Sequence, residues 1–125
     1  MAGSKGSKYF NVFLKYQCWL DTTEGENILG EELINLLKGI AEEGSIQASA
    51  EKNKISYRKA WGKIKKAEEM LLFSIVEKKR GGKNGGQTIL TPDGENLLAA
   101  FDELHSEFDK AIHNIAKKFF NKLNK

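Results

Sequence analysis

The feature that most constrains the fold is a glycine-rich basic run, Arg80–Gly86, in which four of seven residues are glycine. Two short β-rich segments, Ser74–Lys79 and Gln87–Thr91, flank this run. Glycine readily adopts the left-handed backbone conformations that tight turns need, so this arrangement is typical of a β-hairpin. The pattern therefore predicts a hairpin, and the polar residues at its tip are Arg80, Lys83 and Asn84.

A strand, a loop and a first helix are predicted at the start of the chain. Apolar and other residues alternate over Phe10–Leu20, which favours a strand with one buried face and places Cys18 in it as a small packed residue. Asp21–Gly30 is polar and reads as a loop. From Glu31 the apolar residues recur at intervals of three and four, and Gly44 is expected to end this helix.

Two further helices are predicted from their capping residues. Ser45 and Ser56 each stand where an N-cap belongs, because a serine hydroxyl accepts a hydrogen bond from an amide two or three residues later. A short helix is therefore expected over Ile46–Asn53, a turn over residues 53–55, and another helix behind Ser56. The apolar spacing predicts that the buried stripe of this last helix consists of Ala60, Ile64, Ala67 and Leu71.

A long helix is predicted after the hairpin. Thr91 caps it, Pro92 occupies its first position, and apolar residues continue at helical spacing to about Leu123. Such a helix is about 45 Å long, so its distal half extends beyond the core of a domain of this size. An exposed apolar stripe of that length favours a symmetric homodimer. Its predicted interface residues are Leu104, Phe108, Ile112, Ile115, Phe119 and Phe120.

Positive charge is concentrated in about a quarter of the chain. The net charge of +3 is too small to indicate nucleic acid by itself. Lys52–Lys83, however, holds eleven Lys or Arg against three Glu, a balance of +8, and the rest of the chain carries −5. A lysine-rich helix face is often just solvated, and this alternative stays open for Lys63, Lys65 and Lys66 taken alone. Together with the basic hairpin, the charge favours a nucleic-acid partner.

The order of these elements is that of a winged helix-turn-helix, in a mainly α chain with a small β component. In this fold the second helix of the helix-turn-helix lies in the major groove of duplex DNA, with its first residues nearest the bases. Arg58 is suited to bidentate pairing with guanine, and the helix N-terminus is suited to a phosphate. The predicted DNA-binding residues are Ser45, Gln47, Ser56, Tyr57, Arg58, Lys59, Lys63, Lys66, Arg80, Lys83 and Asn84.

The sequence at these elements also resembles a known family. Gly44-Ser45-Ile46 with Ala48 and Ala50, then Ser56-Tyr57-Arg58-Lys59-Ala60-Trp61, resembles the DNA-binding domain of the ModE family of molybdate-responsive transcriptional regulators. The wing, Gly81–Gly86, and the step Leu90-Thr91-Pro92-Asp93-Gly94 are also similar to that family. LysR-type regulators share the fold and the last step more loosely. The resemblance covers about Phe13 to Leu104 and implies a dimeric, operator-binding regulator.

The chain departs from the ModE pattern in two places. Lys52 and Asn53 replace small and leucine-like residues, and Lys54 replaces the usual turn glycine, which predicts a looser helix-turn geometry. The molybdate-binding domains of the family would follow the long helix, whereas this sequence ends at Lys125. Molybdate sensing therefore cannot be carried over from the family, and a separate sensor protein or a small-anion effector stays open.

The sequence does not favour an enzyme, a metal site or a cofactor. Single Cys18 has no second cysteine with which to share a metal, and the spacing of His105, Asp109 and His113 is only weakly suggestive of chelation. Ser45, Ser56 and Thr91 are accounted for as caps, so no nucleophile with a base can be assembled. Tyr57 and Trp61 could stack on DNA, although Trp61 more often belongs to a core or its edge.

These observations predict a division of the chain into segments and two candidate functions. Residues 1–8 are expected to be disordered, 9–91 to form the winged helix-turn-helix, and 92–125 to form the dimerisation helix. The chain lacks a membrane span or secretory signal, which predicts a cytoplasmic protein without a membrane partner. The expected function is sequence-specific binding of double-stranded DNA. The alternative is a winged-helix module that binds another protein and no DNA.

Overall fold

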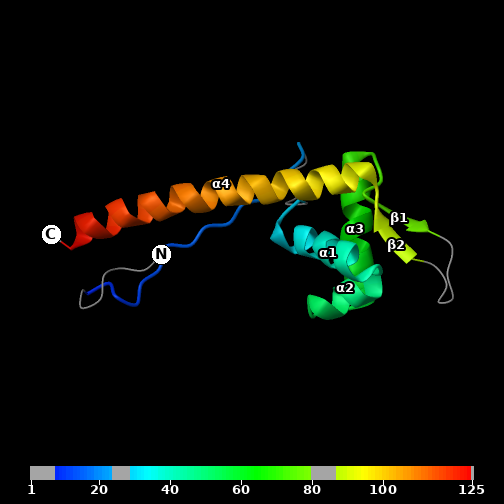
Figure 1. Ribbon diagram of the computed structural model, residues 1–125, viewed down its shortest axis with the longest axis horizontal. Coiled ribbons are helices and arrows are strands. Elements are labelled where there is room, and N and C mark those ends of the chain that lie inside the picture. The colour runs from blue at the N-terminus through cyan, green and yellow to red at the C-terminus, as the bar shows by residue number, and fades with distance from the viewer. Residues whose placement is uncertain (1–7, 24–28, 80–86, 125) are drawn as a thin grey trace. The chain divides into compact units, whose positions relative to one another are not determined.

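The computed structural model describes residues 8–23, 29–79 and 87–124. Its elements follow in the order α1 (Glu31–Glu43), α2 (Ile46–Lys52), α3 (Tyr57–Leu71), β1 (Val76–Lys79), β2 (Gln87–Leu90) and α4 (Pro92–Leu123) (Figure 1). The chain divides into two compact units, one of which is Cys18–Phe101. The other combines the described residues up to Gln17 with α4 from Asp102 onward. The mainly helical architecture with one small sheet is as predicted.

The first helix forms where the apolar spacing predicts it. α1 buries the face that carries Leu33, Leu36, Leu37 and Ile40. Gly44 ends the helix in the left-handed conformation, with φ of 80°, and its N–H donates to the Ile40 carbonyl oxygen. Only glycine adopts this conformation without a steric penalty, which explains the sharp stop.

α1 and α2 approach each other closely at a glycine and a serine. Ser49 is fully buried and its hydroxyl donates to the Leu36 carbonyl oxygen over 2.7 Å. A Cβ added to Gly39 would lie 2.2 Å from the Ser49 Oγ, so the contact requires a glycine here. The hydrogen bond satisfies the one polar group that this tight packing buries.

The helix-turn-helix forms as the capping residues predict. Ser45 accepts from the Ala48 amide at the start of α2, and Ser56 accepts from the Lys59 amide at the start of α3. The turn between them places Lys54 at φ 59°, in the left-handed region that favours glycine. A lysine therefore holds a conformation that costs a residue with a side chain about 1 kcal/mol.

β1 and β2 form the predicted hairpin. They pair antiparallel, with Val76 opposite Leu90 and Lys79 opposite Gln87. The Thr88 amide also donates to the carbonyl oxygen of Gly44, which attaches the hairpin to the end of α1. The tip, residues 80–86, lies outside the described residues.

One apolar core holds the unit Cys18–Phe101 together. The predicted stripe of α3 contributes Ala60, Ile64 and Ala67, all fully buried, and Leu71 packs at its edge. The remaining core residues come from the loop before α1, from α1, α2 and the hairpin, and from the start of α4. They are Leu29, Leu33, Ile34, Leu36, Leu37, Ile40, Ile46, Ala50, Ile75, Val76, Leu90 and Phe101.

The strand predicted over Phe10–Leu20 is wrong. The Val12 amide turns back to the Tyr9 carbonyl oxygen, and Leu20 pairs with Leu29 only in an isolated bridge. The alternation persists in part, since Leu14, Tyr16 and Cys18 are half-buried while their neighbours are exposed. Alternation of apolar residues indicates only which side of a segment is covered. A strand also needs a neighbouring strand to pair its backbone N–H and C=O groups, and in the described residues no strand pairs along this segment.

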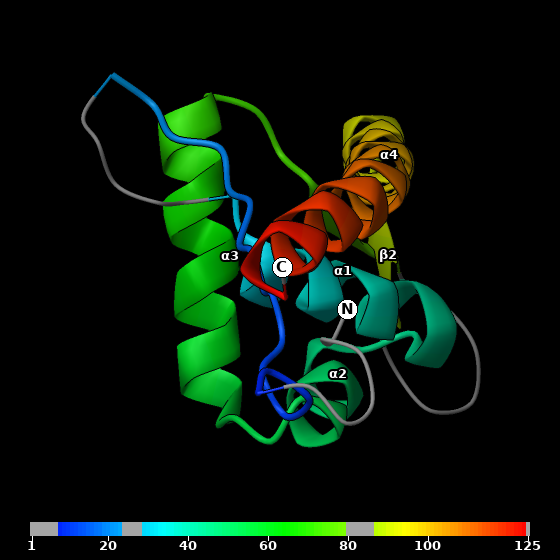
Figure 2. The same ribbon diagram turned by 90° about the vertical axis from the view of Figure 1, so that its left-hand side faces the viewer.

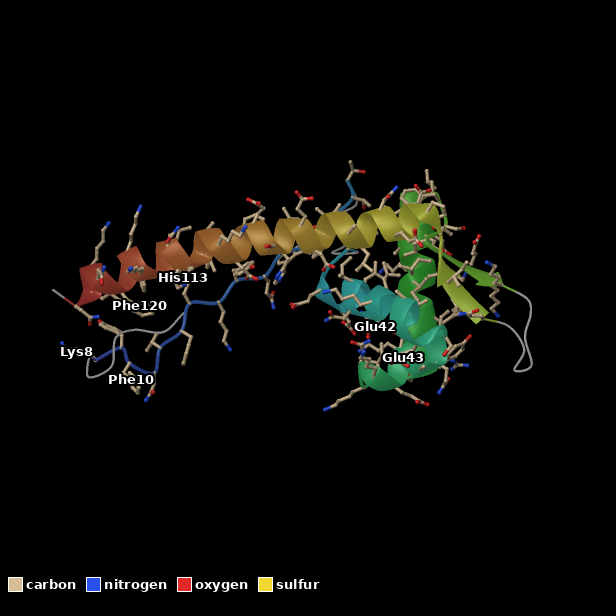
Figure 3. The ribbon with its side chains drawn as sticks, in the orientation of Figure 1. Lys8, Phe10, Glu42, Glu43, His113 and Phe120 are labelled. Carbon is tan, nitrogen blue, oxygen red and sulfur yellow. The ribbon has the colours of Figure 1, made fainter. Side chains whose placement is uncertain are left out.

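The N-terminal segment and the distal part of α4 pack together in their own unit. The Tyr16 hydroxyl donates to Asp109 Oδ1 over 2.6 Å, and its ring lies near the rings of His105 and Phe108. Ala116 is fully buried, and Phe120, only 4% exposed, points toward this segment (Figure 3). One face of distal α4 is therefore covered within the same chain.

Candidate nucleic-acid interface

The start of α3 lies next to α2 (Figure 2), and its first residues are polar or basic. Ser56, Tyr57, Arg58 and Lys59 are all exposed, and Tyr57 keeps 43% of its surface free. As the N-cap, the Ser56 hydroxyl accepts a hydrogen bond from the Lys59 amide, so one of the free amides at the helix N-terminus already has a partner. Within the described residues, Arg58 has no hydrogen bond or ion pair. Its guanidinium is thus available to an external acceptor.

A single carboxylate on α1 pairs with two of the predicted DNA-binding lysines. Lys63 Nζ lies 3.1 Å from Glu32 Oε2, and Lys59 Nζ lies 3.9 Å from Glu32 Oε1. Nothing in the spacing of Glu32 indicates this pairing, because it depends on how α1 and α3 pack. The ion pairs are half-exposed, so they neutralise charge more than they stabilise the fold.

Trp61 and Lys65 occupy another side of α3. Trp61 is 44% exposed and is absent from the apolar core, so of the two expected places it does not occupy the core itself. Lys65 Nζ lies 5.8 Å from the centre of its ring. Lys65 also pairs with Glu68, and Lys66 is exposed.

α2 contributes less free charge than its sequence suggests. Ser45 is committed to its cap, and Gln47 is exposed with its amide bonded to Glu51. Lys52 forms ion pairs with Glu42 and Glu43 at the end of α1, the acids labelled in Figure 3. The hydrogen bond to Glu42 raises the pKa of Lys52 above its usual value, with the charges of Glu42 and Glu43 acting in the same direction.

The hairpin extends the basic surface beyond the helix-turn-helix. Lys78 and Lys79 of β1 are exposed, and the sequence-based assignment missed both. The sequence could have indicated them, because both lysines belong to a basic run that adjoins the predicted tip. Arg80, Lys83 and Asn84, which were assigned to DNA, lie outside the described residues.

The two histidines of α4 do not assemble a metal site in the described part of the chain. His105 Nδ1 lies 3.4 Å from Asp109 Oδ2, and the other oxygen of Asp109 is taken by Tyr16. No group of three potential ligands is close enough to hold a metal among the residues that the structure describes. The Asp109 carboxylate instead fastens the N-terminal segment.

The sequence is similar to curated ModE and Mop proteins. It is 35% identical over 89 residues to the molybdenum-pterin-binding protein MopB of Rhodobacter capsulatus, covering 71% of this chain and 33% of MopB. It is 38% identical over 80 residues to the transcriptional regulator ModE of Haemophilus influenzae, covering 64% and 31% of the two chains. ModE of Escherichia coli K12, described as a DNA-binding transcriptional dual regulator, is 40% identical over 79 residues, with coverages of 63% and 30%.

The chain is a homologue of the N-terminal region of ModE regulators. The similarity confirms the resemblance found in the helix-turn-helix and wing. This ModE-like chain spans about one third of the length of the curated relatives it matches. The relatives named here are regulators and a molybdenum-pterin-binding protein, and none bears the name of an enzyme.

The fold of the ModE-like chain is also found among solved structures. Full-length OxyR C199D from Pseudomonas aeruginosa matches it with a TM-score of 0.51 and 24% identity, over 70% of this chain and 28% of OxyR. At this level of identity the match establishes the LysR-like winged helix-turn-helix fold alone. No family model matches the sequence. Among the described residues, no helix combines the length and apolar character needed to cross a membrane.

Proposed function

We propose that this ModE-like chain is a transcriptional regulator that binds double-stranded DNA with α2, α3 and the wing. The observation that carries the proposal is Arg58 in the first turn of α3, which is exposed and forms no hydrogen bond or ion pair with any residue that the structure describes. That position is nearest the base edges when such a helix enters the major groove. Exposed Tyr57, Lys78 and Lys79 extend the same basic surface, and the homology to ModE supports the same reading.

The proposal is tested by fluorescence-anisotropy titration of the protein against selected and random duplexes at several salt concentrations. Phosphate contacts release counterions, so the logarithm of the affinity is expected to fall linearly with the logarithm of the salt concentration. A preference for the selected duplex supports a sequence-specific regulator. Absence of binding at physiological salt contradicts the proposal and favours the protein-interaction module.

Replacing Glu32 with glutamine is expected to raise the affinity for duplex DNA about three- to tenfold at low salt. The change releases Lys59 and Lys63 from their shared carboxylate and removes one negative charge near the phosphates. The salt slope should steepen by about one because more lysines can then release counterions. Anisotropy titrations of the variant and the parent measure both quantities.

Glu31 provides the matched control for this prediction. It lies in the same first turn of α1, is exposed, and makes no ion pair with a described residue. Glu31→Gln therefore makes the same change in net charge without releasing a lysine. If the two variants gain equal affinity, the ion pairs with Glu32 do not limit DNA binding.

We infer further that the chain acts as a homodimer through α4. Phe108, Ile115 and Phe119 are 45%, 54% and 48% exposed and recur at helical spacing on one side of α4. This stripe borders the side that buries Phe120, since Phe108 also lies near the Tyr16 ring and Phe119 packs edge-on to Phe120. Leu104 and Ile112 are half-buried. A second copy that presents the same stripe would cover it symmetrically.

Phe119→Asp is expected to shift the protein to monomer at micromolar concentration, because it places a charge in the apolar contact. Sedimentation-equilibrium measurements give the mass directly. Asn114→Asp, at another exposed position of α4, introduces the same charge and should leave the dimer unchanged. A monomeric parent protein, or a dimer that survives Phe119→Asp, would contradict this interface.

A further inference from the structure

We propose that Glu68 is a positioning residue, which helps to fix the β1–β2 hairpin, the described part of the wing, relative to the DNA-facing helix α3 without touching DNA itself. This inference rests on the proposed function, since it concerns how α3 and the β1–β2 hairpin are held so that both can contact the same DNA. Glu68 lies on α3, one turn before the helix ends at Leu71. It is the first acid after five cations on this helix, and the sequence offers no reason for its presence on a basic face.

The carboxylate of Glu68 binds the backbone at the base of the wing. Its Oε2 accepts from the amide of Ile75 over 2.7 Å and from the amide of Val76 over 3.2 Å. Its Oε1 accepts from Lys65 Nζ over 3.2 Å. The side chain is 11% exposed, so these hydrogen bonds are largely shielded from water and are charge-assisted.

The same stretch of backbone is also held from α4. The Thr91 hydroxyl donates to the Ser74 carbonyl oxygen, and the Thr91 amide donates to the Ile75 carbonyl oxygen. Residues 74–76 are thus fastened by α3 on one side and by the start of α4 on the other. Of these hydrogen bonds, those from Glu68 are the ones made by a side chain of α3, the helix that is proposed to enter the groove.

This attachment matters because Leu72 and Phe73 do little to fix the path from α3 to the wing. Leu72 is 89% exposed with a left-handed φ of 66°, and Phe73 is 42% exposed. The direction of the chain after α3 therefore depends on contacts made further along, which are the buried side chains of Ile75 and Val76 and the hydrogen bonds to their backbone. Glu68 links this backbone directly to α3, and so helps to set where β1, with Lys78 and Lys79, leaves α3 and whether wing and helix can contact one duplex together.

The test compares DNA affinities of Glu68→Ala, Glu68→Asp and Glu69→Ala with the parent by anisotropy. Glu69 is the next residue and is exposed, so its substitution changes the net charge as Glu68→Ala does. Charge alone predicts that both alanine variants bind more tightly. We expect Glu68→Ala to bind about tenfold more weakly, the effect of losing one or two phosphate contacts. Glu68→Asp keeps the charge but is too short to reach both amides, and it should also weaken binding.

A double-mutant cycle with Lys79→Ala ties the effect to the wing. In the parent, Lys79→Ala should lower the affinity and the salt slope, whereas in Glu68→Ala it should change little, because the wing is already displaced. If Glu68→Ala does not fold by circular dichroism, Glu68→Asp decides in its place. Additive effects, or a Glu68 variant that behaves like Glu69→Ala, overturn the inference. Failure of the parent itself to bind any duplex overturns the proposed function instead.

Discussion

Replacing Gly94 with alanine is expected to lower the free energy of unfolding by about 3 kcal/mol, the upper range for an overpacked core. A Cβ on Gly94 would lie 2.1 Å from the Ile75 carbonyl oxygen, far inside van der Waals contact. That oxygen belongs to backbone that already accepts from the Thr91 amide, so it cannot move aside without breaking the hydrogen bond. The start of α4 must then separate from the base of the wing.

Gly62→Ala is the matched control for this prediction. Gly62 lies on α3, and a Cβ there would meet no atom within 4 Å. Alanine removes the entropic cost of a glycine inside a helix, so this variant should be more stable by about 0.5–1 kcal/mol. Urea denaturation followed by circular dichroism measures both changes. Equal stability of the Gly94→Ala variant and the parent would mean that α4 and residue 75 are not in the contact described.

Most of the helical fold could be predicted because its signals are local. Serine caps, a glycine stop and apolar spacing act within a few residues, and the observed bounds of α1, α2 and α4 follow them closely. The strand at Phe10–Leu20 was wrong because pairing depends on a distant partner. The sequence left Trp61 undecided between the core, its edge and a DNA-facing position for a related reason: helical spacing is local, whereas burial depends on how the helices pack.

The residues of the candidate site also fall into those that the sequence could predict and those that it could not. The exposed residues at the start of α3 could be named from sequence because their exposure follows from their position in a capped helix. The roles of Glu32 and Glu68 could not, since each carboxylate acts on residues brought near it by folding. Sequence counts of charge therefore overstated how many cations are free. Lys52, Lys59, Lys63 and Lys65 all have acidic partners within the protein.

Replacing Arg58 with alanine is expected to remove the preference for a selected duplex over a random one, a loss of about five- to 150-fold in the affinity ratio. A bidentate contact to guanine discriminates by about 1–3 kcal/mol, and Arg58 is the candidate for it because no described residue competes for its guanidinium. The residual affinity comes from phosphate contacts by the lysines, and it should depend little on sequence.

Lys79→Ala removes the same charge from the wing and separates specificity from general attraction. It should lower affinity for both duplexes by similar factors and reduce the salt slope by about one, leaving their ratio intact. Anisotropy titrations with the selected and random duplexes at matched salt give the ratio for each variant. If Arg58→Ala and Lys79→Ala weaken binding equally on every sequence, Arg58 contacts only phosphate. The sequence preference would then have to come from another residue, or from the shape of the DNA.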